Sequence, residues 1–372
     1  MGFWDEPQGA AIFKHATLKG YASTYASKTG KFSTGHRVAL VDCYAGQGWY
    51  DDESPASPAL LLQTAEELGK RDVHCWFVEA DPGTHRTLKA RVAKSGAAGS
   101  ATVLEGDIAD HLPTILGQIG KQPLLVFIDP FGIGLPFEQL IGLLARDKGG
   151  SDRSPTEVLL TFVHAGVHRQ GPKLRLLTDP IASESQRRNA EATIRRLDQN
   201  LGGDWWHDIV DAPDFVARVR REYLNRVLAA AGVQWNCISV PVADSRGGRS
   251  IYEMVLFTRH PQGLWFFNDA VSLARRVFED HVDPDRPLTL FEPEEEWVAI
   301  IKANLKRLLS KGQPLRVIDH IDDVFGETLG YARGKHVKEA AKHLAAEGFN
   351  AGSVKVDPHK LVVVPRTATK TA

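Results

Sequence analysis

The stretch LVFIDPFGI (residues 125–133) carries an apolar run that ends in a carboxylate, a proline and a glycine. An apolar run of this length, bounded by turn residues, predicts a strand that is buried on both faces. In an open α/β sheet, ligands bind at the carboxyl ends of the strands, where Asp129 and Pro130 would lie. Asp-Pro followed by glycine is also ordinary turn chemistry. The stretch therefore predicts a site only if the neighbouring strands end in matching groups.

Short apolar runs alternate with helical patterns on both sides of this stretch. The predicted strands are RVALVDCYAG (37–46), HCWFVEAD (74–81), ATVLEGD (101–107), LLVFIDPFG (124–132) and EVLLTFVHAG (157–166). Strands that alternate with helices at this spacing indicate βαβ units. The predicted fold class is therefore α/β, with a mostly parallel sheet.

The rhythm changes after residue 166. Residues 167–234 are polar, arginine-rich and helical in pattern, which indicates an insertion. Two further strands, at 235–244 and 250–260, suggest an antiparallel hairpin, and a helix follows it. We predict that this first domain spans residues 1–281. A proline-bearing linker at 282–293 follows it.

Three short helical patterns and a predicted strand pair fill residues 294–366, which is the order of a winged helix-turn-helix. From residue 300 onward the chain has 13 Lys and Arg against 7 Asp and Glu, although the whole chain is nearly balanced at 45 against 46. Basic side chains on or near the expected recognition helix favour nucleic acid over protein docking. These residues are Arg333, Lys335, Lys338 and Lys342.

Composition excludes several classes of protein. The apolar runs are too short to cross a membrane, and the N-terminus lacks a signal-peptide pattern. The three cysteines, Cys43, Cys75 and Cys237, are far apart and form neither a zinc motif nor a disulfide framework. A cytoplasmic protein without a bound metal is expected.

A glycine loop follows the first strand, in the sequence DCYAGQG (residues 42–48). Glycines permit close approach of the backbone to a ligand, but a tight strand-to-helix turn explains them equally well. A dinucleotide GxGxxG is absent, because Asp51 stands in the third glycine position. The adjacent Trp49 and Tyr50 are either a platform on which a substrate stacks or simple packing.

Acidic residues end the next two strands. Glu79 is placed to accept hydrogen bonds from ribose hydroxyls, and Asp107 to accept one from an adenine amino group. Each acid alone is more often a helix cap or a loop residue. Three successive strand ends with a glycine loop, Glu79 and Asp107 together predict an adenosyl-type site.

In this order, the glycine loop, the two acids and the Asp-Pro-Phe-Gly turn resemble the motifs of class I S-adenosylmethionine-dependent methyltransferases. VDCYAGQGWYDD, FIDPFG and EVLLTFVHAGVHR are similar, more closely, to the three-Cys-motif partner (TcmP) family. The resemblance implies a Rossmann-like methyltransferase domain and S-adenosylmethionine as cofactor. It also implies a radical-SAM-like three-Cys-motif protein as a possible partner. The implied cofactor-binding residues are Asp42, Ala45, Gly46, Gly48, Glu79 and Asp107.

DCYAGQGWYD also resembles the first motif of ribosomal-RNA adenine-N6 methyltransferases, and DPFG that of tRNA guanine-N2 dimethyltransferases. These likenesses imply transfer to an exocyclic amino group of an RNA or DNA base. Asp129 and the Pro130 carbonyl would accept its hydrogen bonds, and Phe131 would stack on the base beside Gly132. Amino methyltransferases usually have a second proline before the aromatic, so the methylated base stays open. A small-molecule or protein methyltransferase and a non-catalytic S-adenosylmethionine-binding subunit of a modification or defence system are the alternatives.

Two other basic segments have competing explanations. Lys14, in FKHATLKGY, could cover the cofactor mouth, as the resemblance suggests, but a solvated lysine on a capping helix is favoured. The arginines of the insertion could follow a phosphate backbone, but a solvated helix with internal ion pairs is slightly favoured. His164 and His168 lack further ligands at metal-binding spacing.

Overall fold

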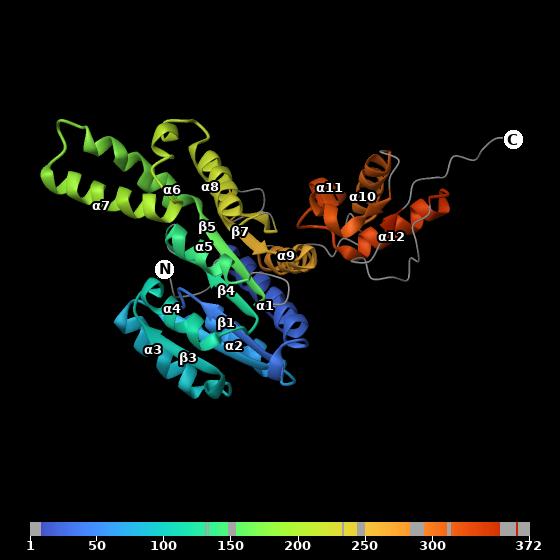
Figure 1. Ribbon diagram of the computed structural model, residues 1–372, viewed down its shortest axis with the longest axis horizontal. Coiled ribbons are helices and arrows are strands. Elements are labelled where there is room, and N and C mark those ends of the chain that lie inside the picture. Colours follow the sequence, from blue (N-terminus) through green and yellow to red (C-terminus); the bar gives the residue numbers. More distant parts are fainter. Residues whose placement is uncertain are drawn as a thin grey trace. The chain divides into compact units, whose positions relative to one another are not determined.

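The computed structural model forms two compact units that divide between Arg259 and His260 (Figure 1). The structure describes residues 9–130, 132, 134–147, 154–232, 234–243, 250–282, 294–310, 314–349 and 362–363.

The first unit is built on a seven-stranded sheet in the order β3-β2-β1-β4-β5-β7-β6. Strands β1 to β5 run parallel, whereas β7 pairs antiparallel with both β5 and β6. The mostly parallel sheet and its closing antiparallel hairpin, both predicted from the sequence, are confirmed. The strands are β1 (Arg37–Asp42), β2 (Asp72–Glu79), β3 (Ala101–Glu105), β4 (Leu124–Ile128), β5 (Thr156–Val163), β6 (Asn236–Ala243) and β7 (Ser250–Thr258).

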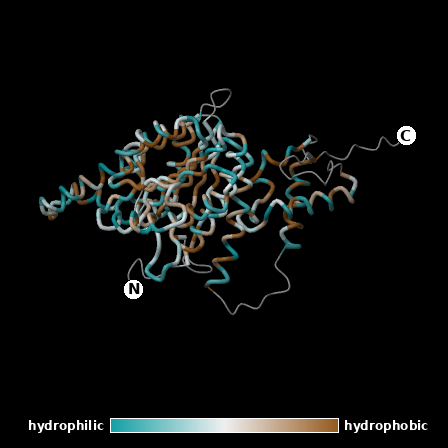
Figure 2. The backbone as a smooth tube through the Cα atoms, turned by 90° about the horizontal axis from the view of Figure 1, so that it is seen from below, coloured by the Kyte–Doolittle hydropathy of each residue, from teal (hydrophilic) through white to brown (hydrophobic). Residues whose placement is uncertain are grey.

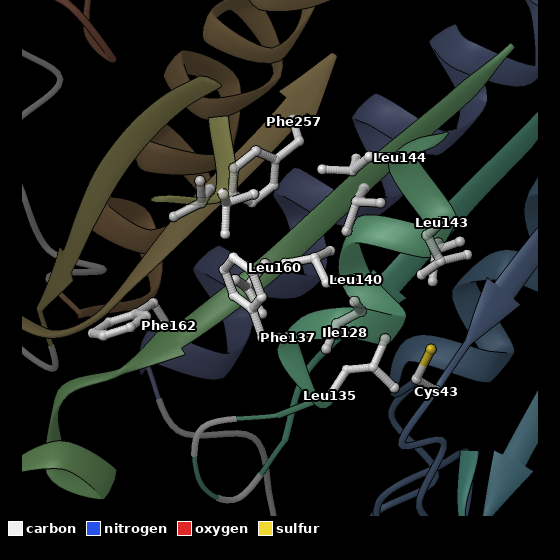
Figure 3. Close-up of a cluster of buried hydrophobic side chains, with 14 of the residues drawn as sticks. Cys43, Ile128, Leu135, Phe137, Leu140, Leu143, Leu144, Leu160, Phe162 and Phe257 are labelled. Carbon is white, nitrogen blue, oxygen red and sulfur yellow. The ribbon is translucent and has the colours of Figure 1, made fainter. Parts of the chain in front are cut away.

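Helices cover both faces of this sheet, as the continuous apolar strands require. Alternate residues of β1 point to opposite faces. Val41 belongs to a core with α4 (Ile108–Ile119) and α5 (Phe137–Ala145), and Figure 3 shows α5 in that core beside β4, β5 and β7. Helices α1 (Gly9–Gly30) and α2 (Ser57–Glu67) contact each other and β1. Helix α3 (Pro82–Lys94) packs against β2 and β3.

The predicted insertion is helical and joins the same core. It comprises α6 (His164–Gln170), a 3-10 segment (Gly171–Leu177), α7 (Glu184–Leu201) and α8 (Phe215–Ala231). Helix α8 packs on α5, and α7 extends beyond the sheet (Figure 1). Figure 2 shows hydrophobic and hydrophilic residues interspersed along the helical segment at the far left. One side of α7 is therefore buried and the other exposed, with Ala190, Ile194, Leu197 and Leu201 on the buried side.

The second unit begins earlier than the sequence predicted. Helix α9 (Pro261–Val282), assigned above to the first domain, packs with the C-terminal helices. Trp265 Nε1 donates to the Ile318 carbonyl at 3.0 Å, and Asn268 Nδ2 donates to the Ala332 carbonyl at 2.8 Å. The structure groups α9 with the C-terminal helices, whereas the sequence placed the boundary at residue 281; an apolar helical stripe does not reveal which core it covers.

The rest of this unit consists of α10 (Glu294–Leu309), α11 (Ile321–Phe325) and α12 (Gly334–Ala346), with β8 (Leu315–Arg316) paired to β9 (Val362–Val363). The second of the three predicted helical patterns, at residues 315–325, instead forms β8, a 3-10 turn and the short α11. Of the strand pair predicted over residues 352–365, only β9 lies in the described residues, and it pairs with β8. The winged helix therefore stays a prediction.

Two findings on the described residues bear on what composition predicted about membrane spans and metal sites. No helix among them is long and apolar enough to cross a membrane. Within the same ranges, no cluster of His, Cys, Asp and Glu could hold a metal ion. Cys43, Cys75 and Cys237 are free thiols.

Candidate functional site

The glycine loop crosses the carboxyl end of β1 between the two neighbouring strands. Its Cys43 N–H donates to the Phe127 carbonyl in β4 at 3.0 Å. Two residues later, the Ala45 N–H donates to the Val78 carbonyl in β2, also at 3.0 Å. These bonds fix the loop at the sheet edge where the sequence predicted it.

Gly46 and Gly48 supply the conformations that the loop needs, with φ of 61° and 87°. A Cβ added at Gly48 would lie 2.8 Å from Leu88 Cδ1, closer than real Cβ contacts. Only glycine therefore fits the chain between the loop and α3 without strain.

We expect Gly48→Ala to lower the free energy of unfolding by about 1–3 kcal/mol, measured by urea denaturation, because strain and a clash add. Gly117→Ala is the matched control. Gly117 lies inside α4, and its added Cβ would meet nothing within 4 Å. Gly117→Ala should leave the free energy of unfolding unchanged or raise it slightly. Equal stability of Gly48→Ala and the wild type would contradict the close approach.

Glu79 closes the next strand and holds the glycine loop directly. Its Oε2 accepts the Gly46 N–H at 2.8 Å, and its Oε1 accepts the Asp81 N–H at 2.8 Å. Each carboxylate oxygen can accept a second hydrogen bond. The structure thus gives Glu79 a loop-shaping role that the sequence did not predict, and leaves acceptor capacity for ribose hydroxyls.

Asp107 is the N-cap of α4, where its Oδ1 accepts the Ala109 N–H at 2.9 Å. The Gly106 N–H before it donates to the Glu79 carbonyl at 3.0 Å, which joins the ends of β2 and β3. The helix-cap interpretation is therefore correct for one oxygen of Asp107. Its Oδ2 makes no hydrogen bond to the described residues and is exposed for another donor.

Asp129 follows β4 and pairs with a lysine from the N-terminal helix. Lys14 Nζ lies 2.5 Å from Asp129 Oδ2, and the two side chains are only 16% and 18% exposed. The same ammonium lies 5.9 Å from the centroid of the Tyr252 ring. The favoured prediction for Lys14, a solvated lysine on a capping helix, is therefore wrong, because α1 carries it into the site.

Two tyrosines complete the surroundings of Asp129. The Tyr252 hydroxyl in β7 donates to the Ala10 carbonyl, which ties the start of α1 to the sheet. Burial, helped by the Asp129 charge, raises the pKa of Tyr252 well above its usual value and that of Tyr50 to about 12. Both phenols therefore stay neutral at physiological pH and serve as hydrogen-bonding groups, not as bases.

Asp42, at the end of β1, is a fully buried carboxyl group on the face covered by α1 and α2. Its Oδ1 accepts the Tyr44 N–H at 3.2 Å. Oδ2 has no hydrogen-bond partner among the described residues, although the Ser57 hydroxyl is close enough to the carboxyl to lower its pKa. Burial raises the pKa of Asp42 to about 7, with Asp129 acting in the same direction.

This raised pKa predicts a pH-dependent stability. The folded protein keeps a proton on Asp42 that the unfolded chain loses near its ordinary pKa of 3.8. Stability should therefore fall as pH rises from about 4 to about 7 and change no further above that range. Asp42→Asn mimics the neutral form, so its melting temperature should exceed that of the wild type by more at pH 8 than at pH 5. An equal difference at both pH values would contradict a buried proton on Asp42.

The remaining predicted site residues differ in how far they are buried. Pro130 is buried and Gly132 half-buried, whereas Phe131 lies outside the described residues. Trp49 is half-buried with its carbonyl accepting from Arg91 at 2.8 Å. Tyr50 is 4% exposed, which favours the packing interpretation for that residue.

Tyr252 was not predicted from the sequence, and Lys14 was predicted to be solvated. Lys14 and Asp129 lie 115 positions apart, and no local pattern links them. The only available signal was the resemblance, which placed Lys14 near the cofactor mouth. Residues that the topology brings together from opposite ends of a domain leave no periodic trace in one sequence.

The predicted nucleic-acid residues of the C-terminal unit are partly neutralised. Lys335 lies 2.5 Å from Glu294, and Lys342 lies 2.6 Å from Glu339. Arg333 stands at the N-cap of α12, and Lys338 is half-buried without an ion pair in the described part of the chain. Helix α12 therefore presents less free positive charge than its sequence suggested.

The chain is similar to a number of solved structures but matches no family model and no curated protein. Nothing in these comparisons supports the three-Cys-motif partner family. Two solved structures of similar fold are the O-methyltransferase TomG from Streptomyces achromogenes in complex with SAM and protein LPL1258 from Legionella pneumophila. TomG is 17% identical, with 69% of this chain and 91% of TomG covered and a TM-score of 0.35. LPL1258 is 12% identical, with 74% and 94% covered and a TM-score of 0.40.

A putative O-methyltransferase from Klebsiella pneumoniae is 15% identical over 68% of this chain and 90% of that one, with a TM-score of 0.32. Likenesses of this strength say nothing about substrate. The strand order and the reversed β7 of this chain decide its architecture. The first unit is an open, mostly parallel α/β sheet with helices on both faces.

Proposed function

We propose that this protein is an S-adenosylmethionine-dependent methyltransferase that acts on an exocyclic amino group of a nucleic-acid base. The observation that carries the proposal is the position of Asp129. It lies after β4, and its charge acts on Asp42 at the end of the adjacent β1. A carboxylate for an amine and a glycine loop for an adenosyl group thus share one sheet edge.

The residues at this edge fit the cofactor. The buried Asp42 Oδ2, without a partner among the described residues, suits the ammonium of a methionine moiety. Glu79 has lone pairs left for ribose hydroxyls, and the exposed Asp107 Oδ2 suits an adenine amino group. The positive-φ glycines let the backbone approach the ligand closely.

Asp129 would orient the amine. Lys14 contacts Oδ2, whereas Oδ1 makes no hydrogen bond to the described residues, so one oxygen can accept an amine N–H. The Pro130 carbonyl would accept the second N–H and aim the nitrogen lone pair. Bound S-adenosylmethionine would supply an already activated methyl group, so positioning by these groups contributes most of the rate.

Calorimetry with S-adenosylmethionine, followed by tritiated methyl transfer onto tRNA, rRNA and genomic DNA with a protein-only control, tests the proposal. Cofactor binding with label on a nucleic acid supports it. If the label appeared on a protein or a small molecule instead, that class of molecule would be the substrate and the nucleic-acid part of the proposal would be wrong. Binding without any transfer would favour a non-catalytic subunit, and absence of binding would exclude the methyltransferase activity.

A further inference from the structure

We propose that the exposed arginine face of α7, formed by Arg188, Arg195 and Arg196, binds the phosphate backbone of the nucleic-acid strand whose base enters the site at Asp129. This inference depends on the proposed function and specifies how the substrate is held. Guanidinium groups suit phosphates because they offer several donors in a planar fork.

The other long helix of the insertion provides an internal contrast. Along α8, arginines placed four residues after an acid form ion pairs. Arg218 lies 2.7 Å from Asp214, and Arg226 lies 2.9 Å from Glu222. The positive charge of these two arginines is thus neutralised within the helix.

Helix α7 has the same spacing without the same pairing. Glu184 and Glu191 each precede an arginine by four residues, at Arg188 and Arg195. Neither pair forms, and Arg196 also has no ion pair within the described part of the chain; all three arginines are exposed. The predicted solvated helix with internal ion pairs is therefore not what α7 shows.

The third acid of α7 is occupied elsewhere. Asp198 accepts hydrogen bonds from Trp206 Nε1 at 2.8 Å and from the His207 ring at 2.9 Å. Arg187, the remaining arginine, donates to the Asp179 carbonyl at 3.0 Å. The free guanidinium groups therefore gather at Arg188, Arg195 and Arg196.

The C-terminal end of α7 is anchored beside the catalytic turn. Asn200 Nδ2 donates to the Gly134 carbonyl at 2.9 Å, just after the Asp-Pro-Phe-Gly turn. Arg196 lies one helical turn before Asn200 on α7, and its charge acts on Tyr44 in the glycine loop. A strand that contacts this end of α7 would be next to Asp129.

The spacing along the helix suits an extended strand. Arg188 and Arg195 are seven residues apart, which is roughly 10 Å along the axis and places them on one face. Arg196 lies one position further on, toward the anchored end. Three such contacts would make binding depend on salt without depending on sequence.

The test compares two triple variants of the full chain. One is Arg188→Gln, Arg195→Gln and Arg196→Gln. The matched control is Arg175→Gln, Arg218→Gln and Arg316→Gln, which removes the same charge from exposed arginines that already pair with Asp211, Asp214 and Asp319. Fluorescence anisotropy with a labelled single-stranded RNA and the DNA of the same sequence, each over a salt series, gives affinity and salt slope. Melting temperatures check that the variants fold.

We expect the α7 variant to bind at least 10-fold more weakly at low salt, with the slope of log affinity against log salt reduced by about 2. The affinity of the control variant for each strand should stay within about 2-fold of the wild-type affinity. If the α7 variant lost affinity for the RNA only, or for the DNA only, that strand would be identified as the one that the arginines bind. A wild-type slope in the α7 variant would overturn this inference and leave the proposed function standing. Failure of the wild type to bind either strand, with S-adenosylmethionine still bound, would overturn both the inference and the nucleic-acid substrate.

Discussion

Asp129→Ala should lower the rate of methyl transfer by about 10²- to 10³-fold while the affinity for S-adenosylmethionine changes by less than a few-fold. The carboxylate is expected to touch the amine and not the cofactor, and loss of a positioning contact of this kind acts on kcat. Its removal also leaves Lys14, 16% exposed, without its anion. Single-turnover kinetics and calorimetry on the same preparation measure both quantities.

Asp107→Ala provides the opposite pattern as a control. Its exposed Oδ2 is expected to contact adenine, so the variant should bind S-adenosylmethionine more weakly and transfer methyl groups near the wild-type rate at saturation. Asp129→Ala with weakened cofactor binding and unchanged saturated rate would mean that Asp129 belongs to the cofactor half of the site.

Lys14→Met should lower kcat by about 10- to 100-fold, because it leaves the Asp129 carboxylate largely buried and without its cation. Methionine keeps the length and apolar stem of the side chain, so the packing of α1 should survive. Affinity for S-adenosylmethionine should be unchanged within a few-fold, measured by calorimetry.

Lys14→Arg tests whether charge is the property that matters. It retains a cation near Asp129 and the Tyr252 ring, and should recover most of the lost rate. Lys19→Met is the second control, because Lys19 lies on the same helix but pairs at the surface with Glu67. If Lys14→Arg lowered kcat as much as Lys14→Met, charge would not be the property that matters. If Lys19→Met lowered kcat by the same factor, α1 would matter only as a structural element.

The sequence predicted the sheet well because each strand carries a strong local signal. Val126, Phe127 and Ile128 cannot be stable outside a core, and the glycine, Glu79 and Asp107 follow strands whose ends share one edge. Parallel topology then brings those ends together without any further information. Glu79 and Asp107 therefore lie at this edge of the sheet, as the sequence predicts.

Contacts between distant segments escaped prediction for the same physical reason. Lys14 looks like any amphipathic lysine until α1 is docked against β1 and Tyr252. Helix α9 looks like a helix of the first domain until Trp265 and Asn268 find their acceptors in the second unit. In each case the local pattern specifies a helix, whereas the partner depends on three-dimensional packing.

The hydrogen bond from Tyr252 to the Ala10 carbonyl bears on the order in which the protein matures during synthesis. The strand that carries Tyr252 is the last of the sheet to leave the ribosome, yet it lies inside the sheet between β5 and β6. A nascent chain that ends before residue 250 thus lacks both the inner strand and the tether of α1. We expect chains that end before residue 250 to hold α1 by its contacts with α2 and β1 but without the Tyr252 bond, so Lys14 should be held less firmly beside Asp129 in them.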